Sequence, residues 1–329
     1  MLKSIRILMI IFTLTIFTGN VRAETNIKVL IVNEIYHQIP SKEEKMERLG
    51  SMKGDLLVMG SRYSGDIDIW KSDKGLYIIN ELPLEEYVKD VVASEVNPDW
   101  DMEALKAQAV ISRTYALYQK MINGNSIYHI ASSVIHQLYK GNNYHVRTAY
   151  AVETTGGEVL TFNGKIIEAL YHSTCGGMTE NPQDVFGKSY PYLKPVKTEC
   201  DISPYSTWER KIKISEIEKA LNLPDVKGLS VKSYTSTKRV KQLDLTTDNG
   251  ILTINAADLR KALGWSILPS TNFSLVLEGE SVLFTGKGYG HGVGLCQWCT
   301  LKLAREGKNY KEILSFFYPD TVIQIYEGF

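Results

Sequence analysis

Glu95 is the residue of this sequence whose position most favours acid–base chemistry. The residues before it place apolar side chains at the spacing of one buried helical face: Leu84, Tyr87, Val88, Val91 and Val92. Glu95 takes the next position on that face, where a carboxyl group loses water and its pKa rises. The C-terminal end of a helix also opposes negative charge. Both effects favour a proton donor near neutral pH, which general acid catalysis requires. The ordinary alternative is an exposed glutamate at a helix end.

Two helices are expected to position this residue, over 84–95 and 102–120, with a break at Asn97-Pro98 between them. Asp101 is the expected N-cap of the second helix. The other carboxylates of the first helix lie mostly off the apolar face and are expected to be solvated: Glu85, Glu86 and Asp90.

The second helix is rich in small residues, which allow another element to approach closely: Ala104, Ala107, Ala109, Ser112 and Ala116. Gln108 and Arg113 interrupt this setting. We expect both to be buried with hydrogen-bond partners, because an unpaired buried polar group is costly. Arg113 would bind a carboxylate or hold a backbone loop.

The segment from Tyr171 to Gly177 combines a tyrosine, a histidine and hydroxyl groups with a Gly-Gly turn. It ends a hairpin predicted around Asn163-Gly164, between strands over 158–162 and 165–173. Polar groups at a strand end beside flexible glycines commonly line a cleft, although a single histidine is more often structural than catalytic.

The segment from Thr285 to Gly294 has glycine at every even position from 286 to 294. In an extended chain one face would be bare backbone, which allows a ligand or another segment to approach closely. His291 would lie on the other face. The dinucleotide-binding pattern fails here, because its third glycine would fall on Val293, and no phosphate-binding loop motif occurs. A nucleotide ligand is therefore not expected.

The cysteines, Cys175, Cys200, Cys296 and Cys299, allow three disulfide pairings in an exported chain. Cys296 and Cys299 form a C-x-x-C at the start of a helix expected over 293–306, which could be a redox pair. They could also join His172 and Cys175 in a zinc site. A plain disulfide or a buried thiol pair is the simpler interpretation, since a single C-x-x-C is a weak signal.

Length, charge and the N-terminus define the class of protein. The 329 residues are enough for one large or two modest domains, and 37 basic residues balance 37 acidic ones, so nucleic acid is not an expected partner. Lys3 and Arg6 precede an apolar run that is too short for a comfortable membrane span, followed by Val21-Arg22-Ala23. We expect a signal peptide over 1–23 and export to the cell envelope, periplasm or medium, with an uncleaved membrane anchor as the alternative.

The order of elements predicts an α+β fold of mixed helices and antiparallel sheets with a cleft and a smaller inserted lobe. A β-rich region is expected over 24–80, with a strand over 26–33, a polar loop over 37–53 and a hairpin over 66–80. The remainder, 81–329, would form the main domain, with the lobe inserted at about 206–280.

Three segments of the sequence resemble the family of stage II sporulation protein D and the amidase enhancers (autolysin modifiers). They are LPLEEYVKDVVASEVNPDWDMEALKAQAVISRTYAL, YHSTCGGMTENPQDVFGKSYPYLKPV and GKGYGHGVGLCQWCTLKLAREGKNYKEILSFFYPDT. The resemblance implies a lytic transglycosylase acting on peptidoglycan glycan strands, in sporulation members on strands stripped of peptides. In such enzymes one glutamic acid protonates the glycosidic oxygen and the 6-hydroxyl of muramic acid attacks, giving a 1,6-anhydro end. The family's catalytic glutamate falls on Glu95.

The resemblance also implies which residues lie near the substrate. Positions in the matching motifs are Gln108, Arg113, Gln137, Tyr171, His172, Ser173, His291 and Gln297. Some sporulation members hold zinc after the second helix, but here that region has His129, His136 and His145 and no cysteine, so no metal or other cofactor is expected. Cys296 and Cys299 stand where the family would have Ser and Gly. The alternatives are a non-catalytic cell-wall-binding modifier that helps an amidase partner and, less favoured, a redox protein.

Overall fold

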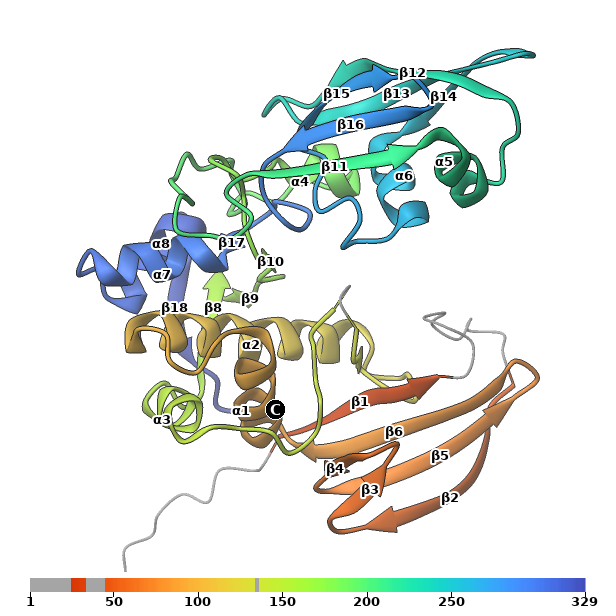
Figure 1. Cartoon of the computed structure of the whole chain (residues 1–329). Helices are drawn as coiled ribbons and strands as arrows, with labels where there is room; N and C mark the ends of the chain where they lie inside the picture. Colours follow the sequence, from red (N-terminus) through yellow and green to blue (C-terminus); the bar gives the residue numbers. More distant parts are fainter. Residues whose placement is uncertain (1–24, 34–44, 134–135, 329) are drawn as a thin grey trace, which may run out of the picture.

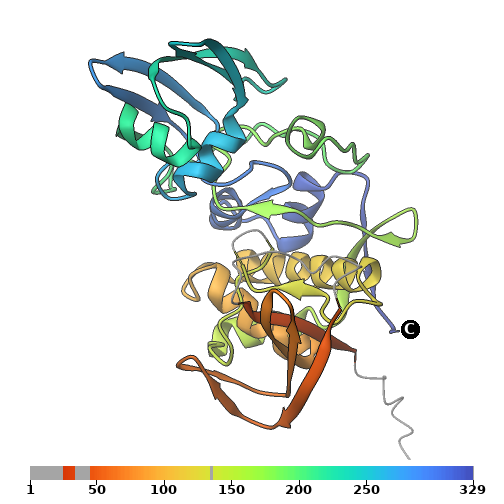
Figure 2. The ribbon, with the colours of Figure 1, turned by 90° about the vertical axis from the view of Figure 1, so that its right-hand side faces the viewer.

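The computed structural model of the chain describes residues 25–33, 45–133 and 136–328 (Figure 1). The expected signal peptide therefore lies outside the described residues. These residues form the helices α1 (Leu84–Glu95), α2 (Met102–Ile122), α3 (Val146–Thr154), α4 (Pro182–Phe186), α5 (Ile214–Leu221), α6 (Ala256–Leu263), α7 (Gln297–Arg305) and α8 (Tyr310–Phe317). Figures 1 and 2 both place a sheet-rich lobe at one end, another sheet at the opposite end, and α2, α7 and α8 between them.

The N-terminal sheet has the strand order β2-β5-β6-β1-β7. Its strands and the small hairpin beside it are β1 (Asn26–Asn33), β2 (Glu47–Lys53), β3 (Leu56–Val58), β4 (Ser61–Tyr63), β5 (Asp66–Ser72), β6 (Gly75–Pro83) and β7 (Ile130–Ala131). The predicted hairpin over 66–80 is confirmed as β5 and β6, which pair in antiparallel register from Asp66 with Glu81 to Ser72 with Gly75. Antiparallel pairing also joins β1 to β6 and β2 to β5.

The expected loop over 37–53 is corrected in its second half, where β2 is a strand. Every residue of β2 is exposed, and the strand lies at the edge of the sheet. A strand without a buried face has no apolar alternation, so no period-two pattern marks it in the sequence. Residues 37–44 of that expected loop lie outside the described residues.

The helix pair beside Glu95 is confirmed as α1 and α2. Asp101 caps α2 as predicted, accepting the Glu103 amide at 2.9 Å. The small residues of α2 are fully or almost fully buried, and α1, α3, β8 (Glu158–Phe162) and α7 pack around the helix. Because small side chains let these elements come close, α2 is the centre of the main core.

The segments that complete the middle of the molecule come from distant parts of the chain. β8 lies between β9 (Lys165–Ile166) and β18 (Val322–Ile325) in a small antiparallel sheet. A two-residue parallel ladder joins β10 (Tyr171–His172) to β17 (Leu295–Cys296). This ladder brings the histidine-containing segment after Leu170 against the end of the glycine-rich run, directly before α7.

The smaller inserted lobe is present and has a core of its own, in which Trp208, Phe273 and Phe284 pack with aliphatic residues. Its last strand extends past the predicted bound of about 280, to Gly286. Two three-stranded antiparallel sheets, with the orders β11-β16-β15 and β12-β13-β14, carry α5 and α6. Their strands are β11 (Trp208–Lys213), β12 (Val226–Tyr234), β13 (Val240–Thr247), β14 (Gly250–Asn255), β15 (Phe273–Glu278) and β16 (Ser281–Gly286). The whole is an α+β fold.

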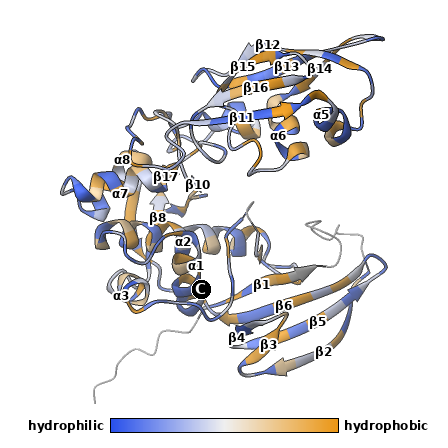
Figure 3. Cartoon of the chain, in the orientation of Figure 1, coloured by the Kyte–Doolittle hydropathy of each residue, from blue (hydrophilic) through white to orange (hydrophobic). Residues whose placement is uncertain are grey.

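No helix among the described residues is long and apolar enough to span a membrane. Figure 3 agrees, since each labelled helix carries hydrophilic as well as hydrophobic residues along its length.

Candidate active site around Glu95

Glu95 is the last residue of α1 and is partly buried. The face that leads to it is buried as predicted, with Tyr87, Val88, Val91 and Val92 fully excluded from solvent. Val96, the next residue, leaves the helix in an extended conformation. The packed helix therefore holds the carboxyl group at a fixed place, where it still has access to solvent.

Two hydrogen-bond donors and a tyrosine hydroxyl from distant segments surround the Glu95 carboxylate. The Leu138 amide donates to Oε1 at 2.7 Å, and Nε2 of Gln297 donates to Oε2 at 3.4 Å. The Tyr171 hydroxyl is buried beside the carboxylate, and no described residue completes a hydrogen bond with it. Burial raises the pKa of the Glu95 carboxyl, because it removes water from the charged form, and these donors and Lys140 offset only part of that effect. The carboxyl is therefore a better proton donor than an ordinary glutamic acid.

The glutamines predicted to lie near Glu95 form a connected network beneath it. Nε2 of Gln297 also donates to Oε1 of Gln108, at 3.3 Å, and Nε2 of Gln108 donates to Oγ of Ser112 at 3.1 Å. Gln137 donates to the Ser112 carbonyl at 3.3 Å and accepts from the Tyr87 hydroxyl at 3.1 Å. Because all three glutamines are buried and satisfied, the network can hold the Gln297 amide in one orientation.

The glycine-rich run departs from the expected extended chain. Gly288, Gly290, Gly292 and Gly294 all have positive φ, from 74° to 108°, a backbone region that favours glycine. A Cβ at Gly294 would lie 1.9 Å from the carbonyl oxygen of Leu170, and one at Gly290 would lie 2.9 Å from Cβ of His172. The bare backbone was expected to admit either a ligand or another segment of the chain. The structure shows another segment, the one that contains β10.

The two predicted histidines contact each other rather than Glu95. Their ring centroids are 5.6 Å apart. Nδ1 of His172 lies 3.1 Å from the Val293 carbonyl, and Nδ1 of His291 accepts the Val293 amide at 3.0 Å. Burial lowers the pKa of His291 to about 4 and that of His172 well below its usual value, so both rings are neutral at pH 7. They hold the β10 and glycine-rich segments together.

Ser173 lies at the same junction. Its carbonyl accepts the amide of Trp298 at 3.1 Å, and its hydroxyl lies 3.3 Å from the hydroxyl of Thr174. Trp298 is partly exposed and meets the buried Trp100 edge to face, with centroids 5.0 Å apart. The start of α7 thus presents an indole group one residue after Gln297.

Arg113 is buried with hydrogen-bond partners, as the sequence predicted. It is fully buried, and its guanidinium forms a bidentate pair with the Glu85 carboxylate, with both N–O distances 2.7 Å. It also donates to the carbonyls of Val152 and Glu158. Both roles expected of it from the sequence are present, and with these partners the residue ties α1, α2, α3 and β8 together, while its place near the substrate stays a prediction. Glu85, expected to be solvated, is its partner.

Asp90 is a correction, because it is buried rather than solvated, with 3% of its surface exposed. One carboxylate oxygen accepts the amides of Asn143 and Tyr144, both at 3.0 Å. Burial raises the pKa of Asp90 from 3.8 to about 6, against the effect of these amides. Its position off the apolar face concealed this, because the loop around 143 covers it only in the folded chain.

The raised pKa of Asp90 predicts a specific pH dependence of stability. The folded state holds this proton up to about pH 6 while the unfolded chain releases it near pH 4, so the free energy of unfolding falls as pH rises through that window. The fall should be roughly 3 kcal/mol for a shift of about two units. Urea unfolding at pH 4, 6 and 8 measures it. Asp90→Asn should remove most of the fall, whereas Asp73→Asn in an exposed turn should not. An unchanged slope in Asp90→Asn would refute the assignment.

The histidines in the region where some family members hold zinc are engaged elsewhere. Nδ1 of His129 accepts the Lys28 amide at 3.0 Å, Nδ1 of His136 lies 3.1 Å from the Tyr115 hydroxyl, and His145 caps α3. They point to separate partners and do not form a ligand cluster among the described residues.

The four cysteines come together in one buried cluster. Cys200 is bonded to Cys299, and Cys175 and Cys296 are free thiols. Cys296 and Cys299 are not bonded to each other, and at most 5% of any of the four side chains is exposed. Reactive redox cysteines are normally partly accessible, so nothing here supports the redox alternative.

Several residues of the site carried no signal that singled them out in the sequence. The Leu138 donor is a backbone amide, which any residue type would supply. Tyr87 and Ser112 were assigned only to packing. Tyr87 lies two helical turns before Glu95 on the same face. This spacing could have predicted a tyrosine hydroxyl in the polar network near the carboxyl.

Comparison with known proteins identifies the family. A family model described as stage II sporulation protein matches residues 72–162, which include Glu95, Gln108 and Gln137. The chain is 32% identical to stage II sporulation protein D of Bacillus subtilis over 269 residues, covering 76% of this chain and 77% of that protein. The chain belongs to the stage II sporulation protein D family.

Other relatives extend this result. An uncharacterized protein of Brachyspira hyodysenteriae is 35% identical over 81% of this chain and 73% of its own length. The amidase enhancer of Bacillus subtilis is 28% identical over 73% of this chain but only 40% of its own length. A second family model, described as a domain of unknown function (DUF8618), matches residues 203–294. In the present chain, that match covers the inserted lobe and the glycine-rich run.

Proposed function

We propose that this protein is a lytic transglycosylase that cleaves peptidoglycan glycan strands with Glu95 as its single acid and base. The observation that carries the proposal is the Glu95 carboxyl itself, which is partly buried, has a raised pKa and accepts hydrogen bonds from two distant segments, at Leu138 and Gln297. A purely structural glutamate at a helix end gains nothing from that setting, whereas a general acid requires it.

The proposed reaction needs no water. Protonated Glu95 gives its proton to the glycosidic oxygen while the bond between C1 and that oxygen breaks. The 6-hydroxyl of the muramic acid residue then attacks C1, and the Glu95 carboxylate takes the hydroxyl proton. The products are a free 4-hydroxyl on one strand and a 1,6-anhydro ring on the other, and Glu95 returns to its starting state.

A single carboxylate distinguishes this scheme from that of ordinary glycosidases, which use two. The groups with the largest effects on the Glu95 pKa are amides, a hydroxyl and Lys140, and no second carboxylate is among these described residues. A nucleophile supplied by the substrate fits that environment. The Tyr171 hydroxyl, buried beside Glu95 with an unused donor, could bind the sugar or the departing oxygen.

The surroundings of Glu95 also suit a sugar. Trp298 follows Gln297 directly and is partly exposed, so its indole could pack against the apolar face of a sugar ring. Gln108, Gln137 and Gln297 supply amides at the base of the site, although their hydrogen bonds with one another give them a positioning role.

The test is direct incubation with glycan strands. Purified protein is mixed with peptide-stripped strands and, in parallel, with intact peptidoglycan, and the products are analysed by mass spectrometry. We expect fragments that end in 1,6-anhydro-muramic acid, 18 mass units lighter than hydrolysed ends because one water is missing. Hydrolysed ends, or no cleavage of either substrate, would overturn the proposal.

The relative named amidase enhancer supports a second candidate, a cell-wall-binding modifier without activity of its own. In that case the protein binds glycan strands and raises the rate of an added amidase, and Glu95→Gln does so equally well. Either function requires export. We propose that residues 1–23 direct it, and N-terminal sequencing of the exported protein should begin at Glu24.

The Gln297 amide should contribute to catalysis through Glu95. Gln297→Ala removes a donor to the carboxylate, so the pKa of Glu95 should rise and the alkaline limb of the pH–rate profile should move to higher pH. Loss of the hydrogen bond should lower kcat/KM about tenfold, or roughly 1.4 kcal/mol. Gln119→Ala is the matched control, because Gln119 is a buried glutamine of α2 that bonds with Asn123 instead. Equal profiles for the two variants would count against this role.

A further inference from the structure

The four cysteine sulfurs lie closer together than a disulfide requires. All four are within 4.8 Å of one another, and they come from three segments: Cys175 after β10, Cys200 in the loop that precedes the lobe, and Cys296 and Cys299 at the start of α7. A disulfide brings together two sulfurs. Convergence of four buried sulfurs is the arrangement found in closed structural zinc sites.

The separations fit a tetrahedral ion. Four thiolates around Zn²⁺, each bonded at about 2.3 Å, place their sulfurs about 3.8 Å apart. The sulfurs of Cys175 and Cys299 are 3.6 Å apart and those of Cys200 and Cys296 are 3.4 Å apart, close to that value. The sulfurs of Cys175 and Cys200 are 2.9 Å apart, so the ion would enter with the Cys200–Cys299 bond absent and with Cys200 turned outward. The Cys296-Gln-Trp-Cys299 spacing also lies within the range of two ligands contributed by one turn of chain.

The backbone around the sulfurs suits negative charge. The amides of Cys175 and Cys299 both donate to Sγ of Cys296, at 3.3 and 3.4 Å. Cys296 is the N-cap of α7, where the helix dipole favours an anion. Both amides would remain hydrogen-bond donors to a zinc-bound thiolate at this position, as outer-shell partners of a metal ligand do.

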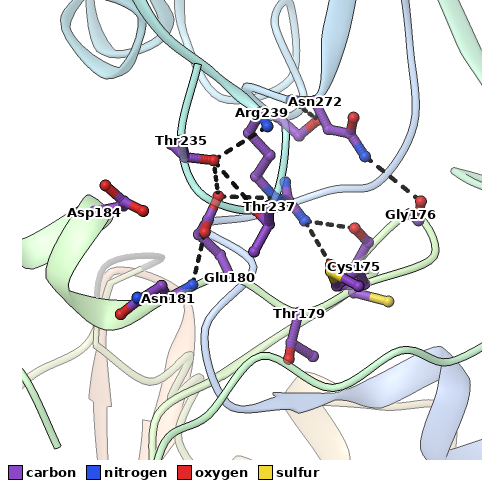
Figure 4. A network of polar contacts seen from close by, with 12 residues as sticks. Cys175, Gly176, Thr179, Glu180, Asn181, Asp184, Thr235, Thr237, Arg239 and Asn272 are labelled. Atoms are coloured by element: carbon purple, nitrogen blue, oxygen red, sulfur yellow. Dashed lines mark hydrogen bonds and ion pairs between the residues drawn. The ribbon is translucent and has the colours of Figure 1, made fainter.

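A buried arginine adds positive charge beside the cluster. Arg239 lies in the loop between β12 and β13 of the lobe, directly before β13. It is 2% exposed and donates to the Cys175 carbonyl (Figure 4). Glu180 lies 3.6 Å from its Nε and satisfies part of its charge, while Nη1 has no hydrogen-bond partner among the described residues. An ion bound by four thiolates carries a net charge of −2, which this cation would partly offset.

We propose that Cys175, Cys200, Cys296 and Cys299 bind one Zn²⁺ as a closed structural site. The cysteines enter as the thiols of the newly made chain, and the four sulfurs release four protons as the ion binds, so no reductant is needed. The zinc-bound form and the form with the Cys200–Cys299 disulfide exclude each other, because both use the sulfurs of Cys200 and Cys299. The ligand set differs from the one considered from the sequence, because Cys200 takes the place of His172.

The site would join β10, the loop before the lobe and α7 at one point. Cys296 immediately precedes Gln297, which donates to Glu95, and Cys175 follows the segment that carries Tyr171. Zinc would therefore fix two elements that contact the acid while remaining outside the reaction. Sulfur atoms occupy all four coordination positions of the ion and leave none for water, so we expect a stabilising role rather than a catalytic one.

Metal and thiol analysis of the full-length protein tests the proposal. The protein is purified without chelator, reductant or a metal-affinity step, and zinc is measured by plasma mass spectrometry. Thiols are counted in denaturant after a chelator is added. We expect one zinc and four thiols per chain. Absence of zinc overturns the proposal, whether the count is four thiols, two with one disulfide, or none with two disulfides.

Cobalt and two variants identify the ligands. Exchange with Co²⁺ should give the intense sulfur-to-cobalt charge-transfer absorption of a tetrathiolate site, and a spectrum without it would refute sulfur ligation. Cys296→Ser should retain less than one tenth of the zinc, whereas His172→Gln, beside the cluster, should retain it. Zinc retained in Cys296→Ser would place the ion elsewhere. The cobalt spectrum of the unmodified protein remains decisive if Cys296→Ser fails to fold.

Discussion

Glu95→Gln is expected to reduce glycan cleavage by at least about 100-fold, the lower end of the contribution of a positioned general acid. Glutamine has the same shape and its oxygen can still accept the Leu138 amide, so the fold should be retained. It has no acidic proton to give to the glycosidic oxygen. The yield of 1,6-anhydro ends from peptide-stripped strands, measured by mass spectrometry over time, gives the rate.

Glu86→Gln is the matched control for this variant. Glu86 is an exposed glutamate of the same helix, whose carboxylate pairs with Lys89 at 3.0 Å, and its replacement should leave the rate within about twofold. If Glu95→Gln cleaved strands as fast as Glu86→Gln, Glu95 would not be the acid. If it bound strands and stimulated an amidase normally, the modifier function would be favoured.

The pH dependence of the unmodified protein should follow the same carboxyl. Cleavage begins with protonated Glu95, so kcat/KM should fall as pH rises through the pKa of Glu95 in the free protein. Burial raises that pKa above its ordinary value, and the alkaline limb should therefore lie above the range of an exposed glutamic acid. A limb within the ordinary carboxyl range would show that the site does not hold the proton.

Glu85→Ala is expected to lower the free energy of unfolding by about 3 kcal/mol, because it leaves the buried Arg113 cation without its carboxylate. The Arg113 guanidinium has no solvent exposure, and without Glu85 it keeps only the carbonyls of Val152 and Glu158. An unpaired buried cation is costly even with two carbonyl acceptors. Urea denaturation at pH 7 followed by circular dichroism measures the change.

Glu86→Ala provides the comparison for stability. It removes an exposed pair one residue away in the chain and should cost less than about 1 kcal/mol. Equal losses for the two variants would mean that the Arg113 pair contributes no more than a surface contact. Arg113→Met removes the buried cation, and the methionine side chain fills most of the space that arginine occupied. It should cost less than Glu85→Ala, since the Glu85 carboxylate left behind is 41% exposed and water can solvate it.

Much of the fold follows from local patterns. Apolar spacing and the Asp101 cap predicted α1 and α2 because helices are stabilised by contacts three and four residues apart. The alternation and turn residues of 66–80, with Ser72-Asp73-Lys74-Gly75 between the two strands, were equally informative for the β5–β6 hairpin. The exposed edge strand β2 was missed, since nothing in its own sequence distinguishes it from a polar loop.

A carboxyl group at the end of a buried helical face could be predicted from local spacing, because it depends on residues within twelve positions of one another. Its surroundings could not, because they depend on tertiary packing. Gln297, 202 residues away, donates to Glu95, and Cys175 lies against Cys299, 124 residues away. Such contacts arise when separate elements pack together, and no local period encodes the partner. Arg113 shows the same limit: its burial was predictable, but which carboxylate it pairs with was decided by packing.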